Sequence, residues 1–122
     1  MGENREYLAH AEDNGTINIS EEVVAAIALD AMKEIDGVGS MSQGEQLTGK
    51  KAARGVHLDV QGDSMEIDLY LMVRYGYAIP EVAQKVQENV SNAVGGMTGF
   101  TVREVNVHVG GISFNDEKEK RN

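Results

Sequence analysis

The most constraining feature of the sequence is an alternation of apolar and polar residues that runs, with one interruption, from residue 56 to residue 74. "VHLDVQ" is apolar at every second position, and "MEIDLYLMVRY" continues the pattern after the turn "GDS". Successive side chains of a strand point to opposite faces, so the pattern predicts strands with one buried face. Two such runs around a short glycine-containing turn predict an antiparallel hairpin, one face of which other elements must cover.

Two further segments carry apolar residues at the spacing of an amphipathic helix. Residues 20–36 start at Ser20, a good N-cap, and Gly37 supplies the left-handed residue that often ends a helix. The second segment starts near Pro80, because proline is favoured in a first helical turn, and we expect Gly95-Gly96 to end it. Each helix has one apolar stripe, formed by Val23, Val24, Ile27, Ala28, Ala31, Met32 and Ile35 in the first and by Val82, Ala83, Val86, Val90, Ala93 and Val94 in the second.

One further strand is predicted before the first helix in the sequence, and another after the second helix. "TINIS" alternates before the first helix, and "FTVREVNVHVGG" follows the second. The apolar phase of the last strand shifts near Arg103 and Glu104, which predicts a β-bulge there. The order β-α-β-β-α-β predicts an α+β fold in which two helices pack on one face of an antiparallel sheet, as in the ferredoxin-like fold or a variant of it.

The length of 122 residues fits one domain. We predict a flexible N-terminal segment over residues 1–14, a single α+β domain over residues 15–114 and a charged flexible tail over residues 115–122. No apolar run approaches the roughly 20 residues that cross a bilayer, and the polar N-terminus does not resemble a signal peptide. The expected location is the cytoplasm, with no direct membrane insertion and any membrane contact made through another molecule.

The charge of the chain argues against nucleic acid as a partner. Lys and Arg number 11 and Asp and Glu number 20, which gives a formal net charge of −9. Such a balance repels a phosphate backbone unless basic residues are concentrated in one patch. The chain also has no cysteine, which excludes disulfides, thiol nucleophiles and thiolate metal sites.

The stretch "GEQLTGKK" at residues 44–51 is one residue short of a nucleotide-binding phosphate loop. In that loop a Ser or Thr follows the lysine to ligate magnesium, and a helix begins there. Here Lys51 replaces the hydroxyl, and only "AARG" separates it from a predicted strand, so we interpret the stretch as an ordinary loop. Lys50, Lys51 and Arg54 still form the densest basic cluster, either as a solvated loop or as a contact for an acidic partner.

No residue pattern supports an enzyme, a metal site or a cofactor site. His10, His57 and His108 do not have the spacing of metal ligands, and a solvated strand face near Asp59 and Asp68 explains the last two better. The acidic residues include no pair whose acid and base roles could be separated, and the serines lack a nucleophile-elbow context. We therefore expect no catalytic, metal-binding or cofactor-binding residues.

One face of the predicted sheet is a candidate surface for a partner or for self-association. Alternation places Tyr70, Met72 and Arg74 on the face opposite the helices, where they would form a semi-apolar patch. Exposed patches of this kind often mark interaction surfaces, although single exposed apolar residues are common. Pairing between sheet edges is a second possible route to self-assembly.

The order of motifs resembles the alkaline shock protein family of Gram-positive bacteria, which includes the general stress proteins called envelope stress response proteins. The similar stretches are "GTINISEEVVAAIALDAMKEIDGVGSM" and "IDLYLMVRYGYAIPEVAQKVQENVSNAVGGMTGFTVREVNVHVGGI", within roughly residues 14–113. Their most specific pieces are Gly37-Val38, Tyr75-Gly76 and "MTGFTVREVNVHVGGI".

This resemblance implies a non-enzymatic cytoplasmic protein that a small membrane-anchored protein gathers at the membrane, and that self-associates as a homo-oligomer in the response to envelope stress. It carries over no catalytic residue, and it assigns no role to the loop over residues 39–55 or to the charged tail. Some branches of the family are tied to fatty-acid metabolism. The alternative function is therefore a regulatory protein that binds a metabolic enzyme or its control machinery, with Lys50, Lys51 and Arg54 as the contact.

Overall fold

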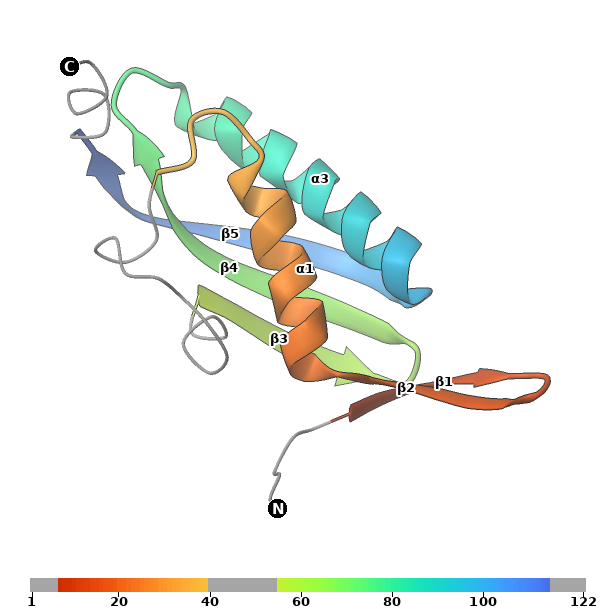
Figure 1. Ribbon diagram of the computed structural model, residues 1–122. Helices are drawn as coiled ribbons and strands as arrows, with labels where there is room; N and C mark the ends of the chain where they lie inside the picture. Colours follow the sequence, from red (N-terminus) through yellow and green to blue (C-terminus); the bar gives the residue numbers. More distant parts are fainter. Residues whose placement is uncertain (1–6, 40–54, 115–122) are drawn as a thin grey trace.

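The computed structural model describes residues 7–39 and 55–114 and contains two helices, a three-stranded sheet and a separate hairpin (Figure 1). The two helices lie on one face of the three-stranded sheet (Figure 1). In chain order the elements are β1 (Tyr7–Glu12), β2 (Gly15–Ser20), α1 (Glu21–Lys33), β3 (Val56–Gln61), β4 (Ser64–Arg74), α3 (Ile79–Thr98) and β5 (Thr101–Ser113).

The predicted α+β fold, with two helices on one sheet face, is confirmed, and the predicted β-α-β-β-α-β elements follow an additional first strand, β1. The sheet differs from expectation in two respects. The strand order is β3-β4-β5, and β4 pairs with β5 in parallel, so the sheet is mixed and not purely antiparallel. The first predicted strand does not enter this sheet, because β2 pairs with β1 instead. Alternation of side chains reports which face of a strand is buried. It does not report which strand lies alongside or in which direction.

The predicted hairpin is present as β3 and β4. Gln61 pairs with Ser64, so the turn consists of Gly62 and Asp63 and is one residue shorter than the stretch "GDS". Gly62 has φ +63°, a left-handed conformation that glycine adopts without steric cost. The Ser64 hydroxyl donates to the Gln61 carbonyl oxygen at 3.1 Å and supports the same turn.

The predicted bulge in the last strand is confirmed. Val102 pairs with Met65 and Glu104 with Glu66, which leaves Arg103 without a pairing residue on β4. A second bulge lies between Val109, which pairs with Leu71, and Gly111, which pairs with Met72. It leaves Gly110 without a pairing residue on β4. The sequence prediction missed this second bulge, because glycine has no side chain and so does not show a change in the alternation of apolar and polar residues.

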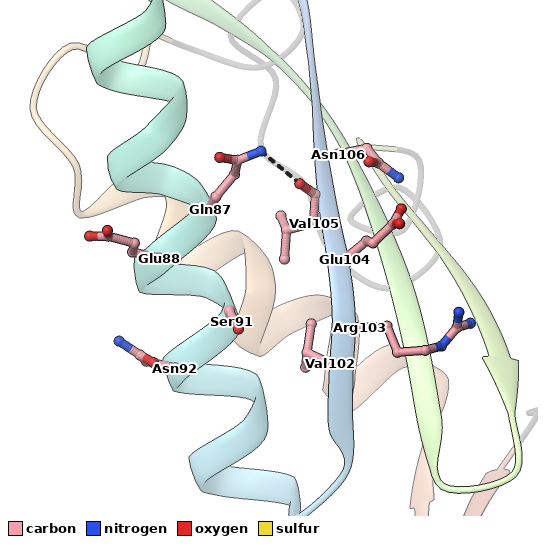
Figure 2. A pocket seen from close by; sticks show the side chains of 9 residues that line it. All are labelled: Gln87, Glu88, Ser91, Asn92, Val102, Arg103, Glu104, Val105 and Asn106. Atoms are coloured by element: carbon pink, nitrogen blue, oxygen red, sulfur yellow. Dashed lines mark hydrogen bonds between the residues drawn. The ribbon is translucent and has the colours of Figure 1, made fainter.

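Helix α3 lies along β5 and is tied to it by a side chain. Gln87 Nε2 donates to the carbonyl oxygen of Val105 at 3.0 Å (Figure 2). At its other side α3 is tied to the end of α1, where Asn89 Nδ2 donates to the carbonyl oxygen of Ala31 at 2.8 Å and to Glu34 Oε1 at 3.1 Å. These contacts fix α3 between α1 and the sheet edge.

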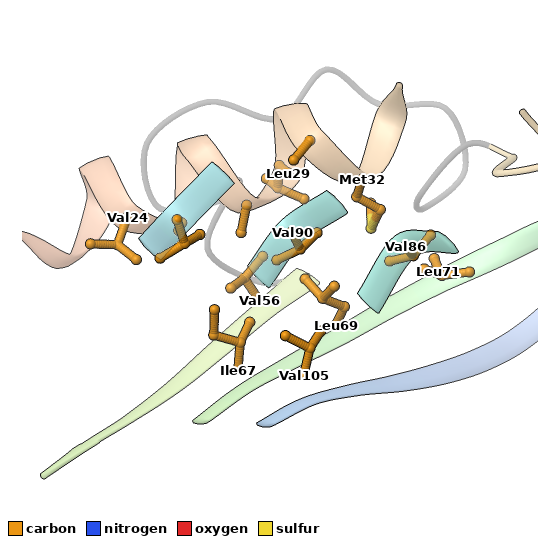
Figure 3. Close-up of a cluster of buried hydrophobic side chains, with 14 of the residues drawn as sticks. Val24, Leu29, Met32, Val56, Ile67, Leu69, Leu71, Val86, Val90 and Val105 are labelled. Atoms are coloured by element: carbon orange, nitrogen blue, oxygen red, sulfur yellow. The ribbon is translucent and has the colours of Figure 1, made fainter. Parts of the chain in front are cut away.

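The core fills the space between the two helices and the inner face of the sheet (Figure 3). In β4, Ile67, Leu69 and Val73 are fully buried, and in α3 the residues at every fourth position are buried as predicted. Burying a side chain of this size stabilises the fold by roughly 1.5–3 kcal/mol. The buried α3 residues are Val82, Val86, Val90 and Val94.

Helix α1 begins as predicted but ends earlier. The Ser20 hydroxyl accepts from the Val23 amide at 3.2 Å, which is the expected N-cap contact. The C-cap is Glu34, so the helix stops short of residue 36. Gly37, with φ +100°, follows the cap and turns the chain back toward the sheet, where its carbonyl oxygen accepts from the Arg74 amide at 2.7 Å.

The prediction that Gly95-Gly96 ends the second helix is wrong. Helix α3 continues to Thr98 and ends at Gly99, which has φ +82° and donates its amide to the Gly95 carbonyl oxygen at 3.0 Å. Two glycines weaken a helix but do not forbid it, and here Phe100 is buried just beyond the end, which favours carrying the helix to that point.

Gly96→Ala is expected to stabilise the protein by about 0.5–1 kcal/mol, because alanine reduces the conformational freedom of the unfolded chain. A Cβ atom built at Gly96 has no heavy atom within 4 Å, so the folded state accepts the methyl group without strain. Urea unfolding followed by circular dichroism measures the change. A destabilised variant would contradict the helical assignment at this position.

The described N-terminal residues form a hairpin that projects from the domain (Figure 1). The expected flexible segment therefore does not hold for Tyr7–Glu12, which pair with β2 over six residue pairs. Leu8 is buried at the base of the hairpin, and the His10 ring lies 5.6 Å from the Phe100 ring. The predicted tail over residues 115–122 lies outside the described residues.

Candidate interaction surface on the outer face of the sheet

Strand β4 presents its two faces to different environments. Leu69 and Leu71 point to the core and are 0% and 3% exposed, whereas Tyr70 between them is 48% exposed. Met72 and Arg74 continue the outer side and are partly buried. The structure thus places the three residues of the predicted patch on the face away from the helices, as alternation requires.

Tyr70 stacks on a histidine of the neighbouring strand. The parallel register pairs Tyr70 with His108, and the two ring centroids lie 4.6 Å apart with an interplanar angle of 16°. Stacked rings of this kind hold each other in one orientation and contribute roughly 0.5–1.5 kcal/mol. The sequence prediction placed His108 on an outward strand face but missed the stack, because the pairing partner of β5 was unknown.

Asp68 accepts two hydrogen bonds beside this stack. Asn106 Nδ2 and His108 Nε2 each lie 3.1 Å from Asp68 Oδ1, and His57 of β3 occupies the paired position on the other side. The hydrogen bond from His108, the hydrogen bond from Asn106 and the charge interactions with His108 and His57 hold the pKa of Asp68 below its usual value, although partial burial opposes the shift. An ionised carboxylate is therefore a fixed part of the outer face.

A second polar contact lies at the bulged end of β5. Arg103 Nη1 is 3.2 Å from Glu66 Oε2, and Arg103 Nε donates to the Ser64 hydroxyl at 3.2 Å. The bulge turns Arg103 toward the outer side of β4, where Ser64 and Glu66 lie. The outer face therefore has a polar half around Glu66 and Asp68 and a more apolar half around Tyr70 and Met72.

Asp68→Asn is expected to lower the free energy of unfolding near neutral pH by less than about 1 kcal/mol, as for other partly exposed pairs. The pKa of Asp68 is lower in the folded state than in the unfolded chain, so the ionised group stabilises the fold above the unfolded pKa. This contribution disappears as the pH falls below about 4, through the folded pKa. Urea unfolding at several pH values should give a shallower acid slope for the variant, and a slope equal to that of the parent would contradict the assignment. Asp59→Asn is the control, because it removes one negative charge from an exposed position of β3 without removing the contacts of Asp68.

The remaining residues named from the sequence lie elsewhere. Lys50, Lys51 and Arg54 fall outside the described residues, so the basic loop stays a prediction. His10 Nε2 lies 3.1 Å from Glu12 Oε2 in the hairpin, far along the chain from the outer-face residues. Within residues 7–39 and 55–114, no group of three or more His, Asp or Glu side chains is arranged to hold a metal ion.

A groove lies on the other side of β5, between that strand and α3 (Figure 2). It has a volume of about 430 Å³ and is lined by Gln87, Glu88, Ser91 and Asn92 of α3 and by residues 102–106 of β5. Neither described helix has the length and apolar character needed to span a bilayer.

Within residues 7–39 and 55–114, these features define a small α+β domain whose helices cover one face of a mixed sheet and leave its outer face open. The chain belongs to the alkaline shock protein 23 family, described as having a cell envelope-related function, and the match covers residues 9–114. The resemblance drawn from the sequence motifs is thereby confirmed.

The chain is similar to several bacterial proteins over most of their length. It is 35% identical over 113 residues to the uncharacterized protein YqhY of Bacillus subtilis (strain 168), covering 87% of this chain and 83% of that protein. It is 35% identical over 106 residues to the uncharacterized protein YloU of the same strain, covering 80% of this chain and 88% of that protein. It is 31% identical over 102 residues to the uncharacterized protein Spy1535 of Streptococcus pyogenes serotype M6, covering 80% of this chain and 79% of that protein.

Among solved structures, the chain is similar to MamM CTD. A MamM CTD structure in a manganese form is 17% identical, with a TM-score of 0.47, and the match covers 74% of this chain and 96% of that chain. A MamM CTD structure in a zinc form is 18% identical, with a TM-score of 0.47, and the match covers 78% of this chain and 89% of that chain.

Proposed function

We propose that this chain is a non-enzymatic, self-associating interaction module of the cell envelope stress response, held at the inner face of the membrane by a small membrane-anchored protein. The cell envelope-related family supports the cellular setting. The observation that carries the proposal is the open outer face of the sheet, where Tyr70 stacks on His108 beside Met72. A strand face that is ordered by ring stacking and hydrogen bonds, but is left exposed, is suited to docking.

The chemistry of the outer face favours a particular kind of partner. Tyr70 and Met72 offer apolar contact, whereas Glu66 and Asp68 offer carboxylates a few positions away on the same strand. The chain as a whole carries a net charge of −9, so its long-range field attracts a positively charged segment. We therefore expect the anchored partner to present an apolar residue flanked by lysine or arginine.

Replacement of Tyr70 tests this surface. Tyr70→Ala is expected to weaken capture of the anchored partner on the order of tenfold or more, because aromatic residues at the centre of an interface often carry 2 kcal/mol or more. Tyr7→Ala is the matched control, since Tyr7 is a 57% exposed tyrosine on β1, which does not belong to the three-stranded sheet. Crosslinking mass spectrometry in intact cells, together with fluorescence imaging of the tagged full chain, measures partner capture and position.

Three results would count against the proposal. Uniform distribution of the parent protein through the cell would remove the membrane recruitment. Equal capture by the Tyr70→Ala and Tyr7→Ala variants would remove the outer face as the docking surface. Capture of lipid-synthesis enzymes in place of membrane-anchored proteins would favour the regulatory alternative, and replacement of Lys50, Lys51 and Arg54 should then abolish that capture.

A further inference from the structure

Strand β5 is a long strand at the edge of the sheet. It spans Thr101–Ser113, pairs with β4 on one side and, within the described part of the chain, has no strand on the other. Such an edge presents a row of amide and carbonyl groups that can pair with another strand. At 13 residues it is more than twice as long as β3, the six-residue strand at the opposite edge.

One hydrogen bond identifies which backbone groups face outward. The Val105 carbonyl oxygen accepts from Gln87 Nε2, a side chain of α3, so it does not point toward β4 (Figure 2). Backbone groups of alternate residues in a strand point to the same edge. Because the stretch between the two bulges is regular, Val107 and Val109 also direct their amide and carbonyl groups to the outer edge.

The apolar residues of β5 are symmetric about Val107. Val105 and Val109 lie two positions away from it, and Val102 and Ile112 lie five positions away, beyond the two bulges. All five belong to the helix side of the sheet, where Val102, Val107 and Val109 are only partly buried and Ile112 is 37% exposed. A two-fold axis through Val107 would therefore place each of these apolar residues opposite another apolar residue.

On the polar side of the strand, the same two-fold axis does not place like charges opposite each other. About Val107, Asn106 is equivalent to His108, Glu104 to Gly110 and Arg103 to Gly111. Neither Arg103 nor Glu104 would therefore lie opposite the same residue of the partner subunit. Like charges directly opposite each other destabilise paired strands, so this arrangement avoids the usual obstacle to self-pairing.

We propose that a second copy of this chain pairs its β5 antiparallel with this β5, in the register that places Val107 opposite Val107 of the partner subunit. Val105 then pairs with Val109 of the partner subunit, whose amide replaces the Gln87 side chain at the Val105 carbonyl oxygen. The two sheets form one six-stranded sheet, with both outer faces on the same side. This assignment rests on the self-association in the proposed function and specifies its interface.

A single cysteine tests the register, because the chain contains none of its own. Val107→Cys in the full chain is expected to give a reductant-sensitive covalent dimer on mild oxidation, since directly paired antiparallel residues have Cα atoms about 5.5 Å apart, within the range for disulfides. Val105→Cys and Val109→Cys should each crosslink poorly alone but should form a heterodimer when mixed. Val60→Cys, at a partly buried position on β3, is the matched control and should remain uncrosslinked.

A second variant tests the same edge without oxidation. Val107→Pro removes an amide hydrogen that points away from β4, and proline is tolerated at such positions of edge strands. Sedimentation velocity is expected to show a dimer for the parent protein and a monomer for Val107→Pro, while thermal unfolding confirms that both are folded.

The outcomes separate this inference from the proposed function. A parent protein that self-associates while Val107→Cys does not crosslink, or a folded Val107→Pro that stays dimeric, would overturn the β5 interface and leave self-association to another surface. In cells, Val107→Cys crosslinked to a different protein would assign the edge to that protein and overturn the self-pairing. A parent protein that is monomeric at every concentration would overturn self-association itself.

Discussion

Gly37→Ala is expected to lower the free energy of unfolding by about 2–6 kcal/mol. Gly37 has φ +100°, where a side chain costs about 1–3 kcal/mol. A Cβ atom there would lie 2.7 Å from Val82 Cγ2 and 2.8 Å from Tyr77 Cδ2, which adds about 1–3 kcal/mol of overpacking. Small domains are stable by only about 5–15 kcal/mol, so this loss is a large fraction of the total.

The matched control is Gly96→Ala, the same chemical change at a helical glycine with open space around it. Chemical denaturation of both variants should give shifts of opposite sign, Gly37→Ala toward lower denaturant and Gly96→Ala toward higher. A Gly37→Ala protein as stable as the parent would mean that the turn after α1 does not have this backbone conformation at Gly37.

Leu69→Ala is also expected to destabilise the fold by about 2–5 kcal/mol. Leu69 lies at the middle of the central strand, is fully buried, and faces both helices (Figure 3). Truncation leaves a cavity that the surrounding side chains close only in part, so the cost exceeds the loss of hydrophobic transfer energy alone. The midpoint of thermal unfolding measures the change.

The adjacent residue gives the control for this second prediction. Tyr70→Ala removes a larger side chain from the same strand, but from the outer face, so it should destabilise the fold only by about the 0.5–1.5 kcal/mol of the lost stack on His108. The pair therefore separates the two faces of β4: Leu69 is required for folding, and Tyr70 is required for docking under the proposed function. Equal destabilisation by both changes would mean that the outer face is covered in solution.

The sequence alone predicted the features that depend on local pattern. Alternation in residues 65–73 assigned Leu69 to the core and Tyr70 to the outer face, and the phase shift at Arg103 located a bulge. Both assignments depend only on the period of two that every strand shares. The Ser20 N-cap is equally local, since the capping contact spans three residues.

The features that sequence reasoning missed depend on contacts between distant segments. The Tyr70 and His108 stack requires β4 and β5 to be parallel neighbours, which neither strand encodes by itself. The continuation of α3 through Gly95-Gly96 depends on burial of Phe100 beyond the helix end, a tertiary effect that overrides the weak helical preference of glycine.

The projecting β1–β2 hairpin makes the cooperative folding unit smaller than the described chain. Its outer part, from Ala11 to Thr16, is solvent-exposed on both sides, and an isolated two-stranded ribbon is only marginally stable in water. Amide protons of these residues should therefore exchange with deuterium by local opening, far faster than those of α1 and β4, which are released only when the whole domain unfolds.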